Sequence, residues 1–235
     1  MTNRAASRTA FPTARLAGVL YLIIIVCGVW SEAGVRAGLI VAGDAAATVA
    51  NVIAAEGLFR LSMSADAVMA LSDVALAILL YRLLRAFGEG LALAATAFRL
   101  VQAAIIGAGL ALLAGALVAL GGDGFAAADQ GQGVAYTLIA MHGIGYDIGL
   151  LFFGVNSLLV GMLLARVGGI ARLIGFALLA AGAVYLAGSF IRLLAPELTA
   201  SFMPAYAICL LAESTFCLLL LVRGDRPFAA SRASH

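Results

Sequence analysis

Six long runs of apolar residues, separated by short polar segments, dominate the chain. They lie at about 16–33, 61–81, 91–120, 141–165, 172–194 and 204–222. A helix needs about 20 residues to cross the hydrocarbon core of a bilayer, which is about 30 Å thick. Backbone groups in lipid must bond within their own segment, so runs of this length predict α-helices. The pattern therefore predicts an all-α integral membrane bundle of six transmembrane helices, in a single polytopic domain over residues 1–235.

The segments outside the runs hold most of the charged residues of the chain. We expect a loop at 34–60 with a short helix at about 45–55, and a Gly/Asp-rich loop at 121–133. Pro196 is expected to end the fifth helix. The first run follows an arginine-bearing start, and residues 31–33 resemble a weak signal-peptide cleavage site. We expect this run to be retained as a helix, because five further hydrophobic segments follow it.

Composition agrees with a protein that is solvated by lipid. Apolar residues make up 64% of the chain and charged residues 11%, and the mean hydropathy is +1.12. Soluble domains average about 25% charged residues. All 14 basic residues are arginines, and they lie near the ends of the apolar runs. They form no basic face of the kind that reads nucleic acid, so nucleic acid is not expected as a partner.

The arginines also predict an orientation. With the N-terminus inside, ten arginines fall in cytoplasmic segments, whereas the outer segments hold only Arg36, Arg60 and Arg192. Cytoplasmic segments carry the excess of basic residues in membrane proteins. Both termini are therefore predicted to be cytoplasmic. Arg99 is the exception, because it lies inside a span.

Polar residues recur on one face of five predicted helices. Residues three, four or seven apart share a face of a helix. An Asp or Arg at the centre of a bilayer costs about 2.5–3.5 kcal/mol, so such faces turn towards the bundle interior. The stripes are Ser62, Asp66 and Asp73; Arg99 and Gln102; His142, Tyr146, Gly149, Phe153 and Asn156; Tyr185, Ser189 and Arg192; and Tyr206, Cys209, Glu213 and Cys217. We expect them to meet in a common interior.

Depth predicts one ion pair in the middle of the membrane. Asp73 lies 12 residues past the outer start of its run, which is about 18 Å of helix. Arg99 lies eight residues from the inner start of the next run, about 12 Å. In a core about 30 Å thick these depths coincide, so we expect Asp73 and Arg99 to form this ion pair. Asn156 and Glu213 fall in the same layer.

A second polar group is predicted near the outer face. It comprises Asp66, His142, Asp147 and Arg192. Asp147 points away from the His142 stripe, so we expect it either to pair with Arg192 or to meet water. A lone histidine near an interface is more often an interfacial polar group than a ligand.

Glu213 is the most informative of these residues, because the sequence offers no obvious arginine as its ion-pair partner. A carboxyl group in a low dielectric favours its neutral form. It is either a functional proton site or a carboxylic acid bonded to a neighbouring helix. The candidate binding or proton-carrying residues are Glu213, Asp66, His142, Tyr146 and Asn156.

Motifs for metal, nucleotide or covalent chemistry are missing from the sequence. There is no HExxH, GxSxG, GxGxxG or GxxxxGK[ST] motif, and the three cysteines form no CxxC pair. Besides His235 the chain has only His142, so two axial histidines for a haem are lacking. We expect no metal and no cofactor, and no catalytic residues can be named. Gly145 and Gly149 form a GxxxG motif, which predicts close helix packing.

Several short stretches together have the character of a known family. They are Phe59-Arg60-Leu61-Ser62, Phe98-Arg99-Leu100-Val101-Gln102, the Gly149–Gly154 and Leu159–Leu163 segments, Ile174-Gly175-Phe176, Pro204, Ala212-Glu213 and the closing residues 219–224. These stretches resemble the bacterial membrane family known as domain of unknown function 4386. The resemblance covers nearly the whole chain. It implies a multi-pass protein of the bacterial inner membrane with about six helices, and no particular activity. It also implies that Asp66, Asp73, Arg99 and Glu213 belong to the family pattern, whereas Asn156 stands where a histidine is expected.

Three classes of function fit this pattern. The first is binding or transport of a small or amphipathic solute through a polar intramembrane site, with the small molecule or a lipid as ligand. The second is a non-catalytic membrane subunit or regulator that acts through a protein partner, with its polar groups paired internally and no cavity. The third is an intramembrane enzyme on a lipid-like substrate, in which Asp66, His142 and Asp147 would converge at a lateral opening. The sequence favours them in that order.

Overall fold

The computed structural model describes residues 13–121 and 128–230, and within these ranges it contains helices and no strand. The long helices are α1 (Thr13–Val29), α4 (Glu56–Leu84), α5 (Glu89–Leu120), α6 (Ala128–Val167), α7 (Gly169–Leu194) and α9 (Tyr206–Arg223). The short ones are the π-helix η1 (Trp30–Arg36), α2 (Ala37–Leu39), α3 (Ala45–Ala54), η2 (Arg85–Phe87), η3 (Pro196–Leu198), α8 (Thr199–Phe202), η4 (Met203–Ala205) and α10 (Arg226–Ala230). Six segments of the described chain are long and apolar enough to cross a membrane. The predicted all-α membrane bundle is confirmed.

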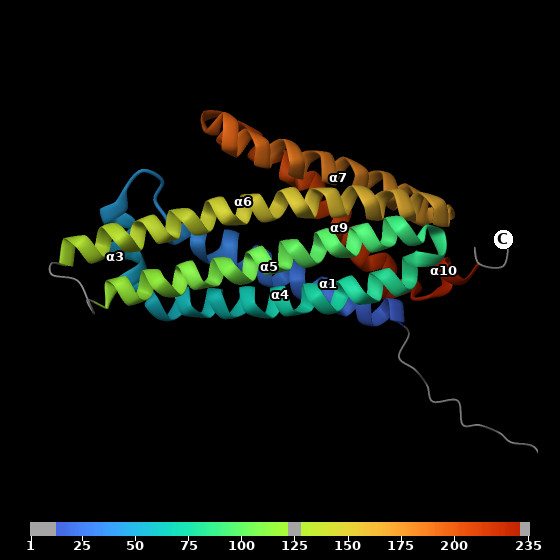
Figure 1. The fold of residues 1–235 in the computed structure, drawn as a ribbon, viewed down its shortest axis with the longest axis horizontal. Helices are drawn as coiled ribbons and strands as arrows, with labels where there is room; N and C mark the ends of the chain where they lie inside the picture. Colours follow the sequence, from blue (N-terminus) through green and yellow to red (C-terminus); the bar gives the residue numbers. More distant parts are fainter. Residues whose placement is uncertain (1–12, 122–127, 231–235) are drawn as a thin grey trace, which may run out of the picture.

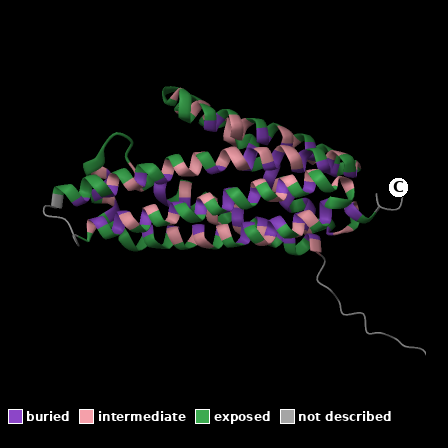
Figure 2. Cartoon of the chain, viewed as in Figure 1, coloured by how far each residue is buried: buried purple, intermediate pink, exposed green. Residues whose placement is uncertain are grey.

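The six long helices form a closed ring. Each packs against the next one along the chain, from α1 to α4, α5, α6, α7 and α9, and α9 closes the ring against α1. Figure 1 shows α4, α5 and α6 side by side, with α7 diverging from α6 towards the end of the bundle that holds α3. We call this the α3 end and the opposite one the α10 end. Buried residues lie between the helices and exposed ones cover the outside (Figure 2).

Helix boundaries differ from the predicted ranges in two places. The loop predicted at 34–60 is shorter, because the first helix continues through η1 and α2 to Leu39 and α4 already begins at Glu56. Of the loop predicted at 121–133, residues 122–127 lie outside the described residues and 128–133 form the first turns of α6. The physical reason is that tertiary packing extends helices through polar residues whose propensity alone does not favour a helix.

Helix α6 is longer than a membrane crossing requires. Its 40 residues correspond to about 60 Å, twice the thickness of a hydrocarbon core. At the α3 end it packs with α3, α4 and α5 around a small separate core. That core contains Val52, Phe59, Leu113, Leu117 and Ile139. The bundle therefore continues beyond one membrane thickness at the α3 end.

Helices α6 and α7 approach each other along a seam of glycines. A Cβ atom on Gly161 would lie 2.7 Å from the carbonyl oxygen of Gly175, and one on Gly175 would lie 2.6 Å from that of Gly161. Gly154 and Gly182 repeat the contact two turns away. Small residues at such positions let two membrane helices pack backbone to backbone. The close packing predicted at Gly145 is wrong, since a Cβ there would meet nothing within 4 Å.

Gly175→Ala should destabilise the bundle. The added methyl group would clash with the backbone of α6, which can move aside only by disturbing the helix. We therefore expect the free energy of unfolding to fall by about 1–3 kcal/mol. Gly145→Ala is the matched control, and its better helix propensity should leave stability unchanged or raise it by up to about 1 kcal/mol. Thermal unfolding of both variants in the same detergent measures the difference. Equal melting temperatures would contradict the glycine seam.

Candidate functional site

A buried ion pair occupies the middle of the ring. Arg99 Nη2 of α5 lies 2.5 Å from Asp73 Oδ1 of α4, and the two side chains are 1% and 2% exposed. The sequence places both residues at similar depth, and the structure brings them into direct contact. The pair joins two adjacent helices of the ring at one height.

Arg99 has further partners on two other helices. Its Nη1 donates to Asn156 Oδ1 of α6 at 3.4 Å, and Asn156 Nδ2 donates to the carbonyl of Ala95 at 2.8 Å. The guanidinium carbon lies 5.2 Å from the ring centroids of both Tyr21 and Phe153. A desolvated cation is stabilised by aromatic faces as well as by carboxylates. Four helices thus converge on one charge.

Glu213 of α9 lies in the same interior without an arginine of its own. The hydroxyl of Tyr185 on α7 donates to Glu213 Oε1, and the glutamate is 7% exposed. Within the described residues, no arginine forms an ion pair with it. The ring of Tyr185 packs between Phe153 and Tyr206, with centroids 5.2 and 5.9 Å away. Among the described residues, Glu213 therefore has a hydrogen-bond donor and no direct ion-pair partner.

A second cluster lies between η1 and α4, nearer the α3 end. Arg36 Nη1 is 2.7 Å from Asp66 Oδ2, and Arg36 Nη2 is 2.7 Å from Glu32 Oε1. The hydroxyl of Ser31 donates to Asp66 Oδ1 at 2.5 Å, and Arg36 also reaches the hydroxyl of Ser62 at 3.3 Å. Arg36 and Asp66 are each 1% exposed. One arginine thus balances two carboxylates.

His142 of α6 borders this cluster. Its Nε2 is 3.9 Å from Glu32 Oε1, and its Nδ1 is 3.2 Å from the carbonyl oxygen of Gly109. A carbonyl can only accept, so Nδ1 is the nitrogen that carries hydrogen in this arrangement. The ring of Tyr146 lies 6.4 Å from that of His142. Asp66 and His142 are therefore linked through Glu32 and Arg36.

Asp147 belongs to a different surface. Its Oδ2 lies 3.3 Å from Arg192 Nε of α7, and the arginine side chain is 43% exposed. No ion pair in the described chain joins these two residues to Asp66 or His142. Of the two outcomes expected for Asp147, the structure shows the pairing with Arg192. The cause is the helix face, since Asp147 points towards α7 whereas His142 points towards α5 and η1.

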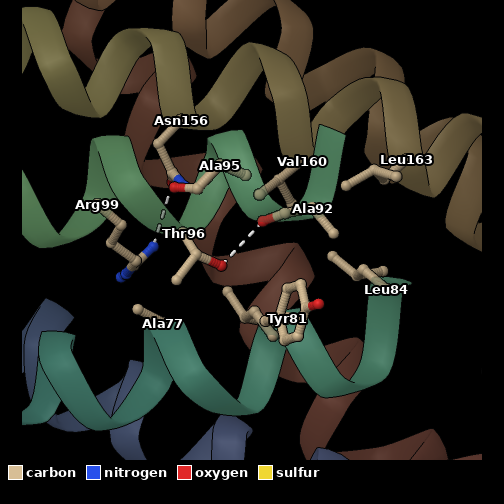
Figure 3. Close-up of a pocket in the computed structure, with 11 residues that line it drawn as sticks. Ala77, Tyr81, Leu84, Ala92, Ala95, Thr96, Arg99, Asn156, Val160 and Leu163 are labelled. Atoms are coloured by element: carbon tan, nitrogen blue, oxygen red, sulfur yellow. Dashed lines mark hydrogen bonds between the residues drawn. The ribbon is translucent and has the colours of Figure 1, made fainter. Parts of the chain in front are cut away.

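The cavity beside Arg99 is small. It has a volume of about 10 Å³ and is lined by Arg99, Asn156 and Thr96 together with apolar side chains of α4, α5 and α6. Figure 3 shows Asn156 bonded to Arg99 and the Thr96 hydroxyl bonded to the carbonyl of Ala92. A volume of this size holds about one water molecule. In this conformation a larger solute does not fit beside Arg99.

Sequence reasoning missed Ser31, Glu32 and Arg36 as site residues, because residues 31–33 resemble a cleavage site and Arg36 falls in the predicted loop. The signal was present: Glu32 and Arg36 stand four residues apart, the spacing of an ion pair on a helix that continues. A π-helical turn frequently marks a functional segment. In the described part of the chain, no three His, Cys, Asp or Glu side chains cluster as metal ligands would.

The fold and its polar interior define a polytopic all-α membrane protein. Residues 16–224 match the family model described as Domain of unknown function (DUF4386), so the chain belongs to this family. Neither the curated proteins nor the solved structures contain a significant match.

Proposed function

We propose that this protein binds or transports a small or amphipathic solute through its polar interior, with Glu213 as the residue that exchanges a proton. One observation carries the proposal. Glu213 is buried and bonded to Tyr185, yet no arginine of the described chain pairs with it. Ionisable groups inside a membrane commonly mark substrate or proton paths.

The contrast with the other interior carboxylates supports this assignment. Asp66 and Asp73 each contact an arginine at 2.7 Å or less, so adding a proton to either breaks an ion pair. Glu213 gains or loses a proton without that cost. A hydroxyl partner such as that of Tyr185 can donate to the carboxylate and can accept from the carboxylic acid. The pair therefore accommodates both protonation states.

An aromatic column offers a place for the apolar part of a solute. The rings of Phe153, Tyr185, Tyr206 and Phe202 follow one another, with centroids 5.2, 5.9 and 6.0 Å apart. The column runs from the level of Glu213 to the short helices before α9. Aromatic side chains with hydroxyl groups suit ligands that are apolar at one end and polar at the other. Access for a solute requires α7 and α9 to move relative to α6.

We also propose a membrane and an orientation, which rest on the distribution of the arginines. The described chain carries Arg15, Arg82, Arg85, Arg166, Arg172, Arg223 and Arg226 towards the α10 end, and Arg36, Arg60 and Arg192 towards the α3 end. Basic residues accumulate on the cytoplasmic side. We assign the α10 end to the cytoplasm of a bacterial cell, with the bundle in the inner membrane and both termini inside.

Glu213→Gln should abolish solute-dependent proton movement. Wild type and variant are reconstituted in liposomes, and a trapped pH-sensitive dye follows internal pH while a panel of small and amphipathic solutes is added. Glutamine keeps a hydrogen-bond partner for Tyr185 but cannot exchange a proton, so flux should fall to the level of empty liposomes. Glu197→Gln, at an exposed carboxylate on η3, is the control and should retain the flux. Retained flux in Glu213→Gln, or no flux with any solute in wild type, would overturn the proposal.

A second candidate is a non-catalytic membrane subunit that acts through a protein partner. Two observations favour it: the interior ion pairs of Arg36 and Arg99 are complete within the chain, and the cavity beside Arg99 holds no more than about one water. It predicts that the intact protein leaves its native membrane in a complex of fixed stoichiometry. Native mass spectrometry of membrane vesicles measures this. A free monomer in those vesicles would contradict the second candidate.

A further inference from the structure

A polar recess opens at the α10 end, away from the Glu213 interior. It has a volume of about 720 Å³ and lies where the end of α4, η2, the start of α1 and α10 come together. Arg82, Arg85 and Thr13 contribute its polar rim, and Leu83 and Phe228 contribute apolar surface. The side chain of Phe228 is 2% exposed, so it forms a packed floor. The recess is large enough for a polar headgroup.

The two arginines of the recess lack ion-pair partners among the described residues, whereas each of its two carboxylates accepts a hydrogen bond from a neutral donor. Asp225 accepts from the backbone nitrogen of Ala14 at 2.9 Å, and Glu89 accepts from the hydroxyl of Tyr81 at 3.2 Å. Arg82 and Arg85 are both exposed and form no ion pair with any residue that the structure describes.

These two arginines stand at the end of a membrane-spanning helix. Arg82 lies in the last turn of α4 and Arg85 opens η2, directly after the apolar run. Hydrocarbon gives way to headgroups at this level of a bilayer. Guanidinium groups bind phosphate oxygens through paired N–H donors. Basic pockets between transmembrane helices are a recurring setting for anionic lipid headgroups.

We propose that this recess binds the phosphate of an anionic glycerophospholipid, held by Arg82 and Arg85 with its acyl chains in the adjacent bilayer. The site is separate from Glu213, and the proposal does not depend on proton exchange there. The two arginines are three residues apart, a spacing that makes side chains neighbours on a helical surface, and both line the recess, so a single phosphate can engage both guanidinium groups. An anchored lipid would also tie α10 to the bundle.

The test measures lipid binding by the full chain in detergent. Native mass spectrometry is performed with phosphatidylglycerol, cardiolipin or phosphatidylcholine added at equal concentration. We expect the anionic lipids to bind wild type in preference to phosphatidylcholine. The double variant Arg82→Gln/Arg85→Gln should bind these anionic lipids at least about tenfold more weakly. Arg172→Gln, at an exposed arginine near the same end that does not line the recess, should bind like wild type. Unchanged binding in the double variant, or equal loss in Arg172→Gln, would overturn the site.

A second arm separates the lipid from free phosphate. Inorganic phosphate at millimolar concentration is added alone, and thermal unfolding of the wild-type protein is followed. We expect little stabilisation, because a free ion lacks acyl chains to bury beside the recess. If inorganic phosphate stabilises wild type as strongly as the anionic lipids, and the double variant loses both effects, the lipid assignment is wrong. The double variant alters exposed side chains only, so its elution as a folded monodisperse species provides the folding control.

Discussion

Asp73→Asn is expected to lower the free energy of unfolding by about 3–5 kcal/mol, the cost of removing one partner from a buried ion pair. Arg99 remains charged at all accessible pH values, and its side chain is 1% exposed. Asn156 and the ring faces of Tyr21 and Phe153 would still surround it. None of them carries a negative charge, so the guanidinium would lose the carboxylate that it contacts directly and remain buried.

The reverse change should cost less. In Arg99→Gln the remaining group is Asp73, and a carboxylate can shed its charge by taking up a proton, which an arginine cannot do. The double variant Asp73→Asn/Arg99→Gln places two neutral amides side by side. We expect it to recover part of the loss, with a coupling energy of about 0.5–3 kcal/mol, as for other residues in direct contact.

Thermal unfolding in detergent measures these effects, with the fraction of protein that stays monodisperse after heating as the readout. For a chain of this size about 1 kcal/mol corresponds to roughly 2–4 °C. Asp73→Asn should therefore melt about 10 °C below wild type. Glu56→Gln is the control, because it breaks an exposed pair in which the side chains are 61% and 51% exposed. Additive losses in the double variant would show that the two side chains do not stabilise one another.

Arg36→Gln should cause a loss of similar size, about 3–5 kcal/mol. Arg36 lies against Glu32 and Asp66, each at 2.7 Å, so its removal leaves two carboxylates close together. Glu32 is 38% exposed and can be solvated by water, whereas Asp66 is 1% exposed and cannot. The penalty therefore arises mainly at Asp66.

A lysine at this position provides a graded test. Arg36→Lys keeps the charge but replaces a planar fork of five donors by a single ammonium group. It cannot reach Glu32, Asp66 and Ser62 together, so its melting temperature should fall between those of wild type and Arg36→Gln. Arg60→Gln is the control at an exposed i,i+4 pair on α4, and should cost less than about 1 kcal/mol. An Arg36→Gln protein as stable as Arg60→Gln would disprove the role of this cluster.

The sequence was sufficient to predict six membrane helices and the polar stripes on five of them. Hydrophobic run length and helical period are local properties of the chain, so they survive folding unchanged. The common depth of Asp73 and Arg99 could also be predicted from the sequence, because it depends only on counting residues from the ends of two adjacent runs.

Tertiary structure alone decided the other polar contacts of the interior. The continuation of the first helix through η1, which buries Arg36 against Asp66, depends on packing against α4. The bond between Tyr185 and Glu213, and the contact of Gly161 with Gly175, depend on how α7 is rotated about its axis and how closely it approaches its neighbours. Rotation and approach are set by side chains on two helices at once, because each face must fill the space left by the other. The sequence shows which face of each helix turns inward. The packed bundle determines which side chains of the neighbouring helices lie opposite that face.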